Sequence, residues 1–176
     1  MSGLLASLVG ALALAALNTF GDFVWARFIP RHRVVFGLAH GVVLLMALGL
    51  HLGLLRRRPL RGALAGAGVG LLAAASFYAL VSLLGYSAMF VSWMALWVGF
   101  AWVDAHLRGV GLGGEVMWRG LLAAVGSGLA FYAVSGIWTK PSPGGPNYAY
   151  HFICWTIAFL PGLLALLLGW RRRDTR

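Results

Sequence analysis

Six long apolar segments, separated by short polar or arginine-rich stretches, account for most of the 176-residue chain. A helix needs about 20 mostly apolar residues to cross the hydrocarbon core of a bilayer. None of the segments carries charged residues along one face, as a helix on the surface of a soluble protein would. The pattern therefore predicts six transmembrane helices, at residues 4–26, 34–55, 62–85, 87–106, 117–138 and 150–170.

The composition agrees with a membrane protein. Hydrophobic residues make up 61% of the chain and charged residues 10%, which is far from the balance of a soluble protein. The six spans leave no room for a separate soluble domain, so we expect residues 1–176 to form a single transmembrane domain. Cys154 is the single cysteine, which excludes an internal disulfide and a CxxC pair. The predicted fold class is an all-α membrane protein, a six-transmembrane-helix bundle.

The 14 basic residues predict the orientation of this bundle. An even number of spans puts both termini on one side, and the loops on the other side carry only Arg27, Arg31, Arg33 and Lys140. The remaining ten basic residues lie on the side of the termini: Arg56, Arg57, Arg58, Arg61, Arg108, Arg119, Arg171, Arg172, Arg173 and Arg176. Because cytoplasmic loops are enriched in Lys and Arg, both termini are predicted to be cytoplasmic, in a bacterial inner membrane. The net charge of +10 then indicates contact with anionic lipids and not with nucleic acid.

Two sequence patterns concern the packing of the helices. His51 and Arg61, with the leucine and glycine that follow them, recur as His106 and Arg119, at a spacing worth checking for repeats. This is consistent with three tandem helical hairpins, although apolar sequence also matches itself by chance. Small residues recur every fourth position in the first, third and fifth spans, for example at Gly62, Gly66 and Gly70. Such small-xxx-small stripes allow close helix packing in lipid, and we expect these three helices to be the inner ones.

Ionisable residues within membrane spans are rare and indicate function. Several of them, and several polar residues, fall near the predicted outer ends of the spans, close to a proline- and glycine-rich loop at residues 139–151. We predict an outward-facing polar pocket beneath this loop, formed by Asn18, Asp22, Arg27, Arg31, His32, His40, Tyr148 and His151. The basic residues favour an anionic solute or a lipid headgroup. The alternative is that Asp22 pairs with an arginine and that the loop is only a connector.

The histidines support a different interpretation. His40 and His51 lie 11 residues apart on one helix, hence on one face and about 16 Å apart along its axis. His151 begins the sixth span near the depth of His40, and His106 ends the fourth near the depth of His51. Two cross-helix histidine pairs are what a carrier of two b-type haems needs as axial ligands. Haem b is therefore an alternative cofactor, whereas the first interpretation needs none.

Other chemistries lack their residues. The only lysine, Lys140, is in a loop, no histidine cluster has zinc-site spacing, and there is no GxSxG. The sequence thus favours a non-enzymatic protein that binds or passes a small anionic solute or lipid headgroup. Serving as an accessory subunit of a larger membrane complex, or as a homo-oligomer, fits equally. A membrane enzyme that acts on a lipid at the outer face, with His32 or His151 as base, is the remaining alternative.

Overall fold

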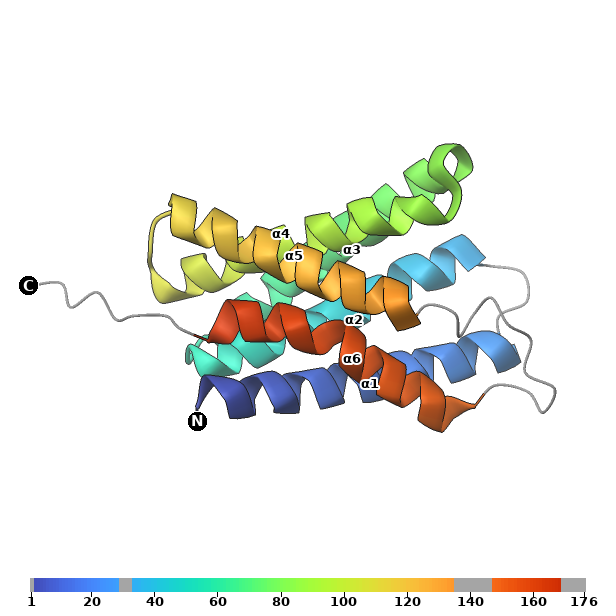
Figure 1. The fold of residues 1–176 in the computed structure, drawn as a ribbon, viewed down its shortest axis with the longest axis horizontal. Coiled ribbons are helices and arrows are strands. Elements are labelled where there is room, and N and C mark those ends of the chain that lie inside the picture. Colours follow the sequence, from blue (N-terminus) through green and yellow to red (C-terminus); the bar gives the residue numbers. More distant parts are fainter. Residues whose placement is uncertain (1, 29–32, 135–146, 169–176) are drawn as a thin grey trace, which may run out of the picture.

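A computed structural model describes residues 2–28, 33–134 and 147–168, apart from the side chains of Arg33 and Tyr86. Within these ranges the chain is helical and has no strand (Figure 1). Six of its helices are long and apolar enough to cross a membrane, which confirms the predicted fold class. The elements are α1 (Gly3–Phe28), α2 (Arg33–Leu55), α3 (Pro59–Leu84), the short 3-10 helix η1 (Gly85–Ser87), α4 (Ala88–Arg108), α5 (Gly114–Val134) and α6 (Tyr148–Leu167).

The helix ends follow local sequence signals. α3 begins at Pro59, earlier than the predicted residue 62, because proline is well suited to the first turn of a helix. α4 ends before Gly109, whose φ of 72° is left-handed, a conformation that glycine adopts without strain. The parts of the predicted spans at 135–138 and 169–170 lie outside the described residues.

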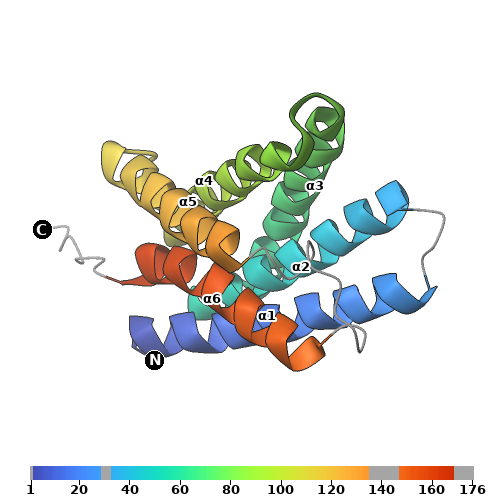
Figure 2. The ribbon, with the colours of Figure 1, turned by 45° about the vertical axis from the view of Figure 1, so that its right-hand side comes forward.

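The helices form a ring in chain order, in which each packs against the next and α6 returns to α1 (Figure 2). Of the neighbouring pairs in this ring, α1 and α2 touch least, whereas α2 and α3 pack most closely. The start of α1 lies against the end of α6, since a Cβ added at Gly3 would be 2.5 Å from the carbonyl oxygen of Leu167. We call this end of the bundle, where α1, α3 and α5 begin, the basic end, and the other the pocket end. Which end faces the cytoplasm stays a prediction.

Small residues bring α2 and α3 into backbone contact. Gly62, Gly66 and Gly70 are buried, and they face glycines of α2. A Cβ at Gly49 would lie 2.1 Å from the carbonyl oxygen of Gly62, and one at Gly66 would lie 2.3 Å from that of Leu45. The predicted small-xxx-small packing is therefore confirmed for this pair of helices.

The prediction that α3 is an inner helix is wrong. Only 11% of its most apolar 18 residues are buried, against 56% for α4. The glycine stripe is narrow and serves one neighbour, α2, while exposed leucines such as Leu64 and Leu72 cover the rest of α3. The centre is filled instead by large side chains of α4, among them the fully buried Trp97 and Phe100.

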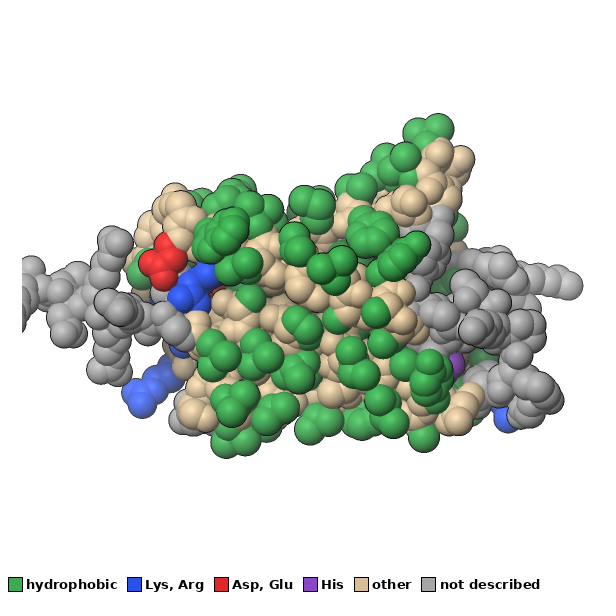
Figure 3. All heavy atoms as spheres, viewed as in Figure 1, with side chains coloured by type: hydrophobic (Ala, Val, Ile, Leu, Met, Phe, Trp, Pro, Cys, Tyr) green, Lys and Arg blue, Asp and Glu red, His purple; other side chains and the backbone are tan. Residues whose placement is uncertain are grey.

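Charged side chains are visible at the basic end in Figure 3, and some of the charged residues at this end join helices. Asp104 of α4 is 1% exposed, and its two carboxylate oxygens lie 2.8 Å from Nε of Arg56 and 2.7 Å from Nε of Arg108. Arg119 of α5 donates to the backbone carbonyl oxygens of Ala165, in α6, and of Leu168, which directly follows α6. Hydrophobic side chains cover the visible flank of the bundle (Figure 3), as a lipid-facing surface requires.

α6 changes direction within its length (Figure 1), and Pro161 lies inside this helix. Proline has no N–H to continue the helical hydrogen bonds and kinks a helix. Ser127 of α5 donates its hydroxyl to the carbonyl oxygen of Ala158 just before the kink. Gly162 then allows the ring of Trp97 to pack against the helix, because a Cβ there would be 2.3 Å from that ring. These contacts hold α6 against α5 and α4 on either side of Pro161.

Candidate binding pocket

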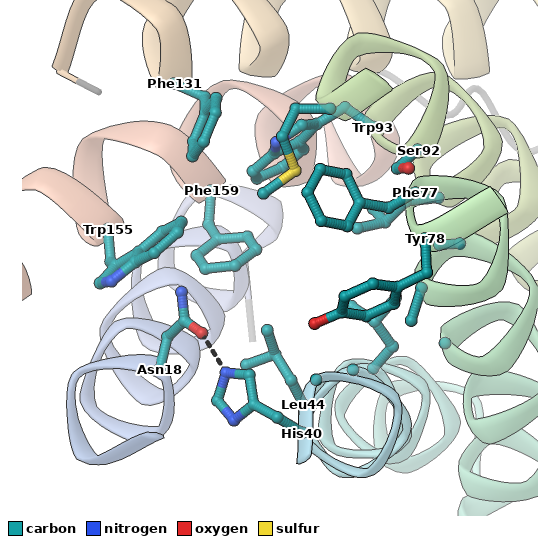
Figure 4. Close-up of a pocket in the computed structure, with 18 of the residues that line it drawn as sticks. Asn18, His40, Leu44, Phe77, Tyr78, Ser92, Trp93, Phe131, Trp155 and Phe159 are labelled. Carbon is teal, nitrogen blue, oxygen red and sulfur yellow. Dashed lines mark hydrogen bonds between the residues drawn. The ribbon is translucent and has the colours of Figure 1, made fainter. Parts of the chain in front are cut away.

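A cavity of about 390 Å³ lies inside the pocket end and is lined by side chains from all six helices (Figure 4). Most of the lining is apolar, and one corner is polar. Seven aromatic side chains, which we call the aromatic wall, account for much of the lining: Trp25, Phe77, Tyr78, Trp93, Phe131, Trp155 and Phe159. The combination of an apolar enclosure and a few polar groups is typical of small-molecule sites.

The inner part of the aromatic wall is a cluster of four buried rings. The Trp93 ring centroid lies 5.1 Å from that of Phe131 and 5.5 Å from that of Phe159. Trp155 stacks on both Phe131 and Phe159, at 5.7 and 5.8 Å. Trp155 and Phe159 are one helical turn apart and so share a face of α6. Because the rings come from α4, α5 and α6, their packing holds these three helices around the cavity.

The outer part of the aromatic wall is more open. Trp25, Phe77 and Tyr78 are only half-buried. The ring of Tyr78 crosses α2 at Gly37, where a Cβ would lie 1.8 Å from the tyrosine oxygen. Figure 4 shows the hydroxyl of Tyr78 pointing into the space between Phe77, Phe159 and His40. The lining thus changes from a buried floor to a half-exposed rim.

Asn18 and His40 form one side of the polar corner. Nε2 of His40 lies 2.6 Å from Oδ1 of Asn18, across the α1–α2 contact (Figure 4). Asn18 is buried, with 3% of its surface exposed. Gly21 provides the room for the histidine, because a Cβ there would lie 2.0 Å from Cε1 of the ring. Phe36, one turn before His40 on α2, stacks on the imidazole with centroids 5.7 Å apart.

Asp22 forms the other side of the polar corner, one turn after Asn18. Its Oδ2 accepts two hydrogen bonds from α6, from Nδ1 of His151 at 2.9 Å and from Nε1 of Trp155 at 2.8 Å. The carboxylate lines the cavity, and its side chain is 21% exposed. Its second oxygen, Oδ1, has no hydrogen-bond partner among the residues that the structure describes. α6 therefore holds Asp22 through one carboxylate oxygen, and the side chain lines the cavity.

The structure brings together part of the predicted polar pocket. Asn18, Asp22 and His40 line the cavity. His151 contacts Asp22 but is not part of the lining, and Tyr148 packs on His151 with ring centroids 5.8 Å apart. The other predicted residues do not line the described cavity or fall outside the described ranges. Arg27 is exposed, with its guanidinium 5.9 Å from the ring centroid of Phe23, whereas Arg31, His32 and loop residues 139–146 lie outside those ranges.

The described lining differs in charge from the predicted pocket. It contains the carboxylate of Asp22 and neither an arginine nor a lysine. The positive charges that favoured an anionic ligand are thus either outside the described ranges or, like Arg27, away from the lining. An anionic ligand stays a prediction that this part of the site does not support.

The candidate haem ligands make other contacts. His40 bonds to Asn18 and His151 to Asp22, as above, while Nε2 of His51 lies 2.9 Å from the carbonyl oxygen of Ala6. His106 is exposed at the basic end. No cluster of three or more histidine, cysteine or acidic side chains suited to a metal ion occurs in the described ranges. The di-haem carrier stays a prediction, and it requires His40 and His51 to give up the bonds that their Nε2 atoms make.

The aromatic wall was not predicted from the sequence. Its strongest signal there is the pair of large rings one turn apart in the sixth span, Trp155 and Phe159. A stripe of this kind is ordinary in an apolar helix, so only the convergence of three helices distinguishes it. The missed partner of Asp22 is Trp155, whose indole lies one turn beyond His151 and bonds to the same oxygen.

Comparison with known proteins identifies no relative. No protein-family model, no curated protein sequence and no solved structure matches this chain.

Proposed function

We propose that this multi-pass membrane protein binds a small, largely apolar organic molecule in the aromatic-lined cavity and passes it between the membrane and its surroundings. The observation that supports this most is the lining itself, in which seven aromatic side chains surround a corner formed by Asn18, Asp22 and His40. Apolar walls with a few placed polar groups bind and orient small ligands. The role is non-catalytic.

The size and position of the cavity support the same proposal. A volume of about 390 Å³ falls in the range of about 300–1,000 Å³ usual for small-molecule sites. The cavity occupies the half of the bundle remote from Arg56, Arg108 and Arg119. If the positive-inside rule holds for this chain, the ligand enters from the outer half of the membrane.

A pair of alanines on α3 allows a direct test. Ala73 is buried and lines the cavity, whereas Ala75, two residues further on, is exposed on the outside of the bundle. Ala73→Leu adds bulk inside the cavity, and Ala75→Leu adds the same bulk to the lipid-facing surface. The first should remove ligand binding and the second should not.

Binding can be followed by tryptophan fluorescence of the purified protein in detergent, since Trp25, Trp93 and Trp155 line the cavity. The probes are three molecules of one shape that differ in charge: choline, 3,3-dimethyl-1-butanol and 3,3-dimethylbutanoate. Saturable binding of any of them that Ala73→Leu abolishes and Ala75→Leu preserves is the expected result. If none of the three probes bound saturably, the proposal would be refuted.

An absorption spectrum of the same preparation addresses the alternative cofactor. The protein is scanned oxidised and then reduced with dithionite. Protein absorption alone is expected. A Soret band with α-bands on reduction would replace this proposal with the di-haem carrier.

A further inference from the structure

We propose that the molecule held in this cavity is an organic cation, with a compact alkylated ammonium group that lies between Asp22 and the aromatic wall. This inference rests on the proposed function, because it names the class of ligand that the cavity takes. It rests on three features of the lining: its charge, the kind of its rings and Oδ1 of Asp22, which accepts no hydrogen bond from the described residues.

The first feature is the charge of the described lining. Asp22 is its one carboxylate, and no arginine or lysine of the described ranges joins it there. The two groups that hold Oδ2 are the indole N–H of Trp155, which is neutral, and Nδ1 of His151, which donates a proton in the neutral form of the ring. Neither bond needs a positive charge. The cavity therefore offers a negative charge that a cationic ligand can balance.

The second feature is the aromatic wall. The face of an aromatic ring carries partial negative charge, so it attracts a cation within about 6 Å, and tryptophan does so most strongly. Three tryptophans and one tyrosine are among the lining residues. Figure 4 shows rings of Trp93, Trp155 and Tyr78 arranged around the same space. An ammonium group with methyl or ethyl substituents presents a surface that is both cationic and apolar, and so it matches these rings.

The third feature is Oδ1 of Asp22, which has no partner in the described part of the chain. A neutral apolar ligand would cover this carboxylate oxygen without bringing a charge to balance it, and burying an uncompensated charge costs free energy. An anion would lie beside a carboxylate and against the negative faces of the rings. A cation is the class of ligand whose charge complements both the carboxylate and the rings.

The three probes of equal shape test this choice in the unmodified protein. Choline carries a positive charge, 3,3-dimethyl-1-butanol is its neutral counterpart, and 3,3-dimethylbutanoate is an anion. Choline should bind about tenfold more tightly than the alcohol, the gain expected from a cation–π contact with a partly desolvated ion pair. Binding of the anion should be weakest. Equal affinity for choline and the alcohol, or a preference for the anion, would overturn the proposal that the ligand is a cation. The proposal that the cavity binds a small molecule would remain.

Replacement of the carboxylate provides a second test. Asp22→Asn keeps the shape of the side chain and an oxygen that accepts from α6, but removes the charge. It should lower the affinity for choline about tenfold and leave the affinity for 3,3-dimethyl-1-butanol unchanged. The control is Glu115→Gln, which removes a half-exposed carboxylate at the basic end and should change neither affinity. An equal loss for both probes with Asp22→Asn would mean that Asp22 only holds the fold, and would overturn its assigned role.

Discussion

The close packing of α2 and α3 gives a sharp prediction for Gly66→Ala. Gly66 lies on α3 and faces α2, and a Cβ added there would be 2.3 Å from the carbonyl oxygen of Leu45 and 2.9 Å from Cα of Gly49. Ordinary contact begins at 3.4 Å, so the two helices would have to separate by 3.4 − 2.3 = 1.1 Å. The atoms in the way are backbone and cannot rotate aside, as a side chain would.

The cost of this separation follows from two opposing effects. Overpacking a tight interface costs about 1–3 kcal/mol, and a rigid backbone contact belongs at the upper end of that range. Replacing glycine by alanine within a helix returns about 1 kcal/mol. The free energy of unfolding should therefore fall by about 2 kcal/mol, which lowers the thermal midpoint by about 4–8 °C for a chain of this size.

Gly68→Ala on the same helix is the matched control. A Cβ at Gly68 meets no atom within 4 Å, so the substitution adds helix propensity without a clash. Both variants are compared with the parent protein by thermal denaturation in one detergent. Gly68→Ala should have an unchanged or raised midpoint. If the two variants had the same midpoint, the backbone contact between α2 and α3 would be refuted.

Three other substitutions test the basic end, the α6 kink and the polar corner, with thermal denaturation and probe titration as measurements. Asp104→Asn leaves two guanidiniums around a buried neutral side chain and should lower the free energy of unfolding by about 3 kcal/mol. Glu115→Gln breaks an exposed ion pair and should lower it by less than about 1 kcal/mol. Equal losses of stability in the two variants would contradict the burial of the Asp104 ion pairs. Ser127→Ala removes the bond to the kinked part of α6 and should cost about 1 kcal/mol while weakening probe binding; unchanged binding would separate the kink from the pocket. Gly21→Ala should push His40 out of its position, because a Cβ would lie 2.0 Å from the ring, and should weaken probe binding with little loss of stability; a large loss of stability instead would mean that the ring cannot move aside.

The six helices could be predicted from the sequence because each depends on local information. The length of an apolar run determines whether it crosses a bilayer, and signals such as Pro59 and Gly109 act within one turn. Close packing of α3 against a neighbouring helix could also be predicted, since a stripe of glycines in a membrane span typically indicates close helix packing. These features depend on the spacing of residues within one helix.

The position of each helix in the bundle could not be predicted in this way. The stripe at Gly62, Gly66 and Gly70 indicates that a neighbouring helix packs closely, but it does not indicate how many helices surround α3. α3 has one tight neighbour and faces outward elsewhere, while large side chains of α4 fill the centre. In water, exposed leucines would oppose such an arrangement, but lipid accepts them without cost, so hydrophobicity does not distinguish the inside of the bundle from its surface.

The polar residues of the candidate site could be predicted from the sequence, whereas its aromatic residues could not. Asn18, Asp22 and His40 stood out because polar residues are costly within a membrane and therefore need a reason to be there. The rings of Trp93, Phe131 and Phe159 gave no such signal, since aromatic side chains are common in any apolar span. Only the packing of α4, α5 and α6 makes them walls of a cavity and not part of the lipid-facing surface.

The two aspartates of the described spans show what distinguishes a structural charge from a candidate site. Asp104 is almost fully buried, and two guanidiniums, from Arg56 and Arg108, balance its charge within the protein. Asp22 is held by an indole and an imidazole, which donate hydrogen bonds without having to be charged. A carboxylate within a membrane requires compensation, and in the described part of the chain no arginine or lysine provides it at Asp22. Arg56 and Arg108 supply the positive charge that balances Asp104. At Asp22, a cationic ligand would supply it.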